Sequence, residues 1–151
     1  MKKYILIFSL LFSSNLFAKE PQAILWNSLA PGPAKLPAEV NINQALDGER
    51  VVIPGFVIPL DALEGQTRDF LLSPRLGACI HRPPPGPNQL IHVTFEQPIA
   101  LPEIEQPVYI SGRLAVRSEK NAFAQTGYFI QGDEAIPYPV KIAPSATNHS
   151  H

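Results

Sequence analysis

The chain has 151 residues, of which 45% are hydrophobic, and its 12 basic and 13 acidic residues give a formal net charge of −1 at pH 7. The length suits a single domain, and the lack of a basic surplus excludes a surface that grips nucleic-acid phosphates. The 17 prolines disfavour long helices and favour strands joined by stiff loops. These features together predict one small, mostly β domain.

Residues 1–18 have the pattern of a secretory signal peptide. Lys2 and Lys3 form a basic start, Tyr4 to Phe12 is an apolar run, and Leu16-Phe17-Ala18 offers a cleavage site. The apolar run is too short for a comfortable membrane span, so we expect no stable membrane insertion of the mature chain. The prediction is cleavage near Ala18 and a mature protein in the bacterial periplasm.

The mature chain divides into three parts. Residues 19–46 contain scattered prolines and predict an irregular, proline-rich N-terminal arm, from which Trp26 and Leu29 pack back onto the domain. Residues 47–143 contain the strand-like runs and predict the β domain itself. Residues 144–151 are polar and predict a disordered tail.

Five alternating or uniformly apolar runs predict the strands of this domain. They cover Val51–Leu60, Arg68–Ser73, Leu90–Glu96, Val108–Arg117 and Thr126–Gln131. Elsewhere we expect a loop over Pro98–Pro107, a loop or short helix over Ser118–Gln125, and a separate edge segment over Ala135–Ile142.

The third of these runs shows the clearest alternation. Ile91, Val93 and Phe95 share one face, which we expect to point into the core, whereas His92 lies on the opposite face. In the first run, Pro54-Gly55 predicts a bulge or a sharp bend. A long bent strand followed by further strands predicts a small OB-like five-stranded barrel, with a β-sandwich as the alternative.

Cys79, His81 and His92 form the one group of residues with metal-binding character. Cys79 is the only cysteine, so in an oxidising compartment it is buried, bound to metal or paired with another molecule. Thiolate and imidazole suit zinc, with copper as the alternative, and three protein ligands leave a fourth position open. The other reading is a buried Cys79, with both histidines hydrogen-bonded to backbone carbonyls of the loop.

A proline-rich loop follows Cys79 and predicts a rigid surface for a partner protein. Consecutive prolines favour the extended polyproline conformation, which loses little entropy on docking. Asn88 and Gln89 follow the prolines, where the simplest role of their amides is to satisfy backbone groups that the prolines leave unpaired. The predicted partner-binding residues are Pro83, Pro84, Pro85, Pro87, Asn88 and Gln89.

No catalytic motif accompanies these residues. The sequence has no G-x-S-x-G elbow, no H-E-x-x-H helix, no glycine-rich phosphate loop and no C-x-x-C redox pair. We therefore predict a protein without enzymatic activity. It either handles a metal or presents its loop to a partner.

Taken together, these segments resemble a family of bacterial exported domains of unknown function, DUF3299. The resemblance rests on the runs Val52–Leu60, Phe70–Leu72, Gly77–His81, Pro83–Pro85, Pro87–Gln89, Ile91–Val93, Val108–Gly112 and Gly127-Tyr128. Some members are lipoproteins, and this chain departs from them because it has no lipobox cysteine. Relatives are often encoded beside export-type ABC permeases, some in zinc-responsive gene clusters. The resemblance thus implies a periplasmic accessory protein of an ABC transporter, with zinc as the expected metal.

Overall fold

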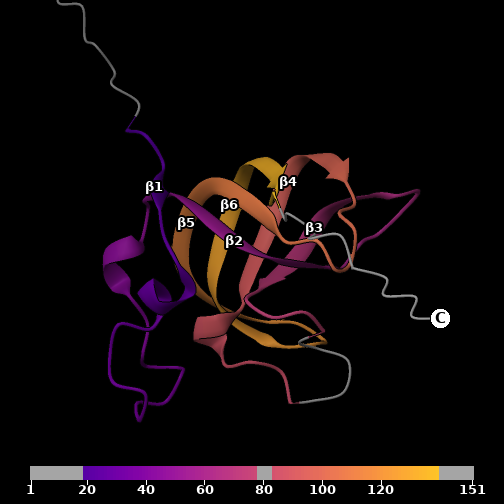
Figure 1. Cartoon of the computed structure of the whole chain (residues 1–151). Coiled ribbons are helices and arrows are strands. Elements are labelled where there is room, and N and C mark those ends of the chain that lie inside the picture. The colour runs from indigo at the N-terminus through magenta and orange to yellow at the C-terminus, as the bar shows by residue number, and fades with distance from the viewer. Residues whose placement is uncertain (1–18, 78–82, 140–151) are drawn as a thin grey trace, which may run out of the picture.

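The computed structural model describes residues 19–77 and 83–139 (Figure 1). Its strands are β1 Gln22–Ala23, β2 Arg50–Pro59, β3 Gln66–Ser73, β4 Ile91–Ala100, β5 Val108–Lys120 and β6 Gln125–Pro137. Three single turns of 3-10 helix accompany them: η1 Trp26–Leu29, η2 Gln44–Leu46 and η3 Pro87–Gln89. The described part of the chain contains no α-helix, so the mostly β fold class is confirmed.

The strands form one mixed sheet in the order β1-β2-β3-β4-β6-β5. An additional antiparallel pairing joins β2 to β5, with Ile53 opposite Ile110. Each of the five long strands therefore pairs with two other long strands, and Figure 1 shows them arranged around one interior. Strands β4 and β6 run parallel, while the other pairs of long strands are antiparallel.

The Pro54-Gly55 step is the point where β2 changes partner. Residues Arg50 to Gly55 pair with β5, and Phe56 to Pro59 pair with β3. One long strand can thus pair with two neighbours. Pro54 has no N–H to donate to a ladder, so it is tolerated at the step where the strand changes partner. This change of partner lies at the step where the sequence predicts a bulge or a sharp bend.

The core has the alternation expected for β4. Ile91, Val93 and Phe95 are buried, and His92 is half-buried on the other face. The faces of this strand were therefore predicted correctly. The largest fully buried side chains of the core include Phe70, Tyr128, Leu29, Ile53, Ile110, Leu114 and Ile130.

Three predicted boundaries are wrong. Strand β4 continues to Ala100, into the first residues of the expected loop, because its pairing with β3 shifts register and includes no ladder partner for Pro98. Strand β5 continues to Lys120, where it pairs with Gln125, so the expected loop or helix is only a tight turn. The expected fifth strand and edge segment are one continuous strand, since β6 follows β5 as far as Pro137.

Residues 19–46 pack on the sheet through apolar side chains and a buried tyrosine. Ile24, Leu29 and Leu46 belong to the same core cluster as the strands. Trp26 packs against that cluster, as predicted, and its indole nitrogen donates to the Pro54 carbonyl at 2.6 Å. The Tyr128 hydroxyl donates to the Leu29 carbonyl, so this segment is tied to the centre of β6.

Candidate functional site

The described part of the proline-rich loop has an exposed half and an anchored half. Pro83 and Pro84 are exposed, whereas Pro87 and Asn88 in η3 are buried. Proline at the start of a helical turn is favoured, because its missing N–H would have no partner there. The loop therefore meets the domain through η3 and exposes the prolines that precede it.

Side-chain amides hold η3 against residues 19–46. The Asn88 Nδ2 donates to the Asn41 carbonyl at 3.2 Å, and the Gln89 Nε2 donates to the Trp26 carbonyl at 3.4 Å. Both amides thus bond to backbone carbonyls of the N-terminal segment, whereas the simplest role predicted from the sequence would require bonds to backbone groups of the proline loop itself. The predicted contact of these residues with a partner stays a prediction.

Of the three predicted metal ligands, only His92 lies in the described part of the chain. Cys79 and His81 fall within residues 78–82, outside it. The His92 ring lies between two carboxylates, with Nε2 2.7 Å from Asp69 Oδ1 and Nδ1 2.5 Å from Glu119 Oε2. One acid comes from β3 and the other from the far end of β5, so the sheet brings together residues distant in sequence.

These contacts favour the charged form of the imidazole. Burial lowers the pKa of His92, but the hydrogen bonds and charges of Glu119 and Asp69 outweigh it, so the pKa lies above 6.5. With both nitrogens protonated, the ring can donate to both carboxylates at once. A metal needs a free nitrogen lone pair, so His92 would have to lose a proton and one of these contacts before it could ligate.

Two further side chains extend this charged cluster. The Arg117 Nε lies 2.6 Å from Glu119 Oε1, and the Arg117 guanidinium stacks 3.9 Å above the Phe129 ring. The cluster of Asp69, His92, Arg117 and Glu119 thus joins two cations to two anions on the outer face of the sheet. Sequence reasoning found only His92, because the irregular pairing between Val116 and Glu119 has no clear signal in the sequence.

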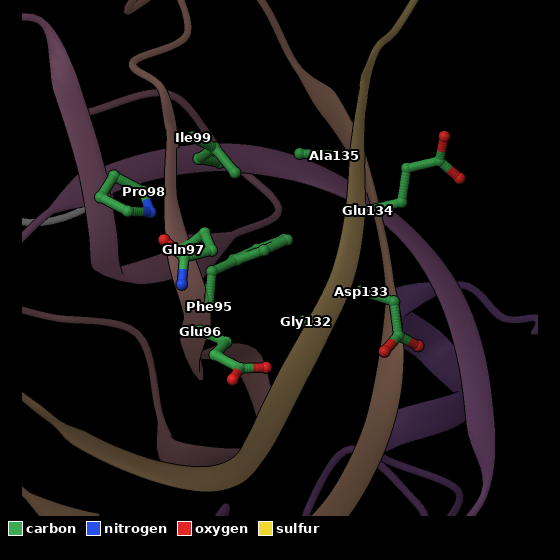
Figure 2. Close-up of a pocket in the computed structure, with 9 residues that line it drawn as sticks. All are labelled: Phe95, Glu96, Gln97, Pro98, Ile99, Gly132, Asp133, Glu134 and Ala135. Carbon is green, nitrogen blue, oxygen red and sulfur yellow. The ribbon is translucent and has the colours of Figure 1, made fainter.

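A groove opens where β4 and β6 separate, at the C-terminal end of β4. The proline loop lies at the N-terminal end of the same strand. It contains a cavity of about 500 Å³ lined by residues of both strands, from Phe95 to Ile99 and from Gly132 to Ala135. In Figure 2 the Phe95 ring points from β4 toward β6, the Glu96 carboxylate lies near β4, and the Asp133 carboxylate lies beyond β6, on the side away from Phe95.

Two kinds of feature are absent from the described residues. Between residues 19 and 77 and between 83 and 139, no group of three or more His, Cys, Asp or Glu side chains is arranged to hold a metal ion. The same residues include no helix long and apolar enough to cross a membrane.

Comparison with known proteins places the chain in a family. Residues 20–137 match the model of the family described as "Protein of unknown function (DUF3299)". The chain belongs to the DUF3299 family. A crystal structure of a DUF3299 protein from Pseudomonas aeruginosa PAO1 is similar, with 31% sequence identity and a TM-score of 0.70. The match covers 80% of this chain and 98% of that one, and no curated protein matches the chain.

Proposed function

We propose that this DUF3299 protein is a periplasmic accessory protein of an ABC transport system, and that it presents its polyproline segment to a permease or another periplasmic protein. The observation that carries the proposal is the division of the loop into exposed prolines, Pro83 and Pro84, and a buried anchor, Pro87 and Asn88. A stiff segment held at its base keeps one shape before and after docking, so binding costs little conformational entropy.

The proposal includes the architecture and the absence of catalysis. The two neighbours of each long strand support an OB-like barrel over a β-sandwich, because a sandwich leaves edge strands with a single neighbour. On such a scaffold the loop is a binding element held on rigid strands. We assign no enzymatic activity to it.

Replacement of the three consecutive prolines, of which Pro83 and Pro84 are exposed and Pro85 is half-buried, tests the proposal. We expect the triple variant Pro83→Ala, Pro84→Ala and Pro85→Ala to fold but to lose most of its co-purification with the permease encoded beside its gene. The matched control is Pro31→Ala with Pro33→Ala, since these two prolines are also exposed but lie in the N-terminal segment. Equal capture of the permease by both folded variants would count against the proposal.

A metal-handling form of the same accessory role uses Cys79, His81 and His92 to hold zinc, or alternatively copper. Its support is the outward position of His92 on β4, which leaves the ring half-buried and not enclosed in the core. If this form holds, carefully purified protein contains close to one equivalent of metal, and Cys79→Ser and His81→Ala each lose it. Protein that lacks metal and also fails to bind added Zn²⁺ or Cu⁺ under reducing conditions would leave only the loop-presenting role.

A further inference from the structure

Strands β4 and β6 pair over only part of their length and then separate. Their parallel pairing ends where Phe95 lies opposite Gly132. Beyond that point β4 pairs only with β3, at Ile99 and Ala100, and β6 pairs only with β5, as far as Pro137. Among residues 19–77 and 83–139, no strand fills the space between them.

The groove between the separated strands has an apolar floor. The Phe95 ring packs so closely against Gly132 that a Cβ atom there would lie 2.4 Å from the ring. Ile99 and Ala135 are half-buried and line both the cavity of about 500 Å³ and a second cavity of about 310 Å³. The two cavities therefore share walls and extend along the direction of the strands.

One wall of the groove is a free strand edge. In an antiparallel pair, the backbone N–H and C=O groups of alternate residues point away from the partner strand. Past Gly132, such groups of β6 point away from β5 and toward the groove. The opposing edge of β4 is a poorer template because Pro98 has no N–H to donate. Strand addition is therefore favoured on β6.

The rim of the groove is acidic. Glu96, Asp133 and Glu134 line the first cavity and Glu103 lines the second, while no lysine or arginine of the described residues lines either. Asp133 is paired with Arg50 at 2.6 Å, whereas Glu96 and Glu134 are exposed. A ligand that brings positive charge complements this rim, and an acidic ligand is repelled.

We propose that this groove binds an extended basic peptide, or an extended basic segment of a partner protein, by adding it as a strand to the free edge of β6. In an extended peptide, side chains alternate between two faces. Small apolar side chains of one face pack on Phe95, Ile99 and Ala135, and basic side chains of the other reach Glu96 and Glu134. This surface is separate from the proline loop, since the loop precedes β4 and the groove lies at its end.

A capped octapeptide of alternating lysine and valine is a direct probe. We expect its binding, followed by fluorescence anisotropy, to weaken as salt is added. The alternating glutamate and valine peptide should bind at least tenfold more weakly. A lysine-valine peptide that is N-methylated on successive amides should also lose binding. Successive N–H groups of an extended peptide point to opposite edges, so this peptide can donate to a neighbouring strand from neither edge. No binding of the first peptide, or equal binding of either control peptide, would overturn the proposal.

Charge reversal on the protein tests the assignment to this groove. The double variant Glu96→Lys and Glu134→Lys should bind the lysine-valine peptide at least tenfold more weakly than the wild type. Both side chains are exposed, so the fold should be unaffected. The matched control is the double variant Glu20→Lys and Glu39→Lys, which reverses two exposed charges that line neither cavity. If both variants weaken binding equally, the peptide responds to net charge alone and the groove is not the site.

Discussion

At the scale of single residues, His92 shows how neighbours set the state of a side chain. Its ring is only partly shielded from water, yet carboxylates from β3 and β5 contact both nitrogens. The charged imidazole therefore has two acceptors in the folded protein that it lacks in the unfolded chain. Because the pKa is raised on folding, protonation and folding favour each other.

The stability that His92 contributes should depend on pH. The contribution is fully present below the unfolded pKa of 6.5 and is lost as the pH rises through the higher folded value. We expect wild type and His92→Gln to differ most in urea-unfolding free energy near pH 5 to 6, and to converge in alkaline buffer. A gap that widens toward alkaline pH would contradict the charged form of the ring.

Phe95 closes the hydrophobic core next to the groove between β4 and β6. It is buried, stacks on Phe70 with ring centroids 6.0 Å apart, and covers Gly132. Phe95→Ala should cost about 3–5 kcal/mol in denaturant unfolding, as for other large core truncations. Gly132→Ala should also destabilise, and Phe95→Leu should partly rescue it by making room for the new methyl group. A neutral Phe95→Ala would show that the ring does not belong to the core.

At the scale of elements, the N-terminal segment is tied to β6 by one phenol. The Tyr128 hydroxyl donates to the Leu29 carbonyl at 2.5 Å and accepts from the Asn43 backbone N–H at 2.7 Å. Tyr128→Phe leaves both backbone groups without this partner, and we expect it to cost about 1–3 kcal/mol. Thermolysin should cut residues 19–46 faster in the variant, whereas cleavage within the strands should stay slow. Unchanged cleavage of the segment would show that its other contacts hold it without the Tyr128 hydroxyl.

At the scale of the whole molecule, the predicted signal peptide lies outside the described residues. We expect export to remove residues 1–18, because Leu16-Phe17-Ala18 offers a cleavage site after the apolar run. Mass spectrometry of protein released from the periplasm without detergent should show a mature chain that starts near Lys19. A membrane-bound chain that retains Met1 would refute both the cleavage and the periplasmic location.

The sequence alone determined the local features of this protein. Alternation along β4 predicted that Ile91, Val93 and Phe95 face inward, because successive side chains of a strand point to opposite faces whatever its neighbours are. The apolar character of Trp26 and Leu29 likewise predicted that they pack on the domain. These properties depend on residues next to one another in the chain.

Only the tertiary structure decided how these local features meet. The parallel pairing of β4 with β6 joins Ile91 to Tyr128, and nothing in either segment specifies the other. Where that pairing ends, the acidic groove opens, so the groove has no signal in the sequence. The acids that hold His92 are 23 and 27 residues away. The sequence thus placed His92 on the face opposite the core and named it a candidate metal ligand, but its charge depends on contacts that form only when β3, β4 and β5 come together.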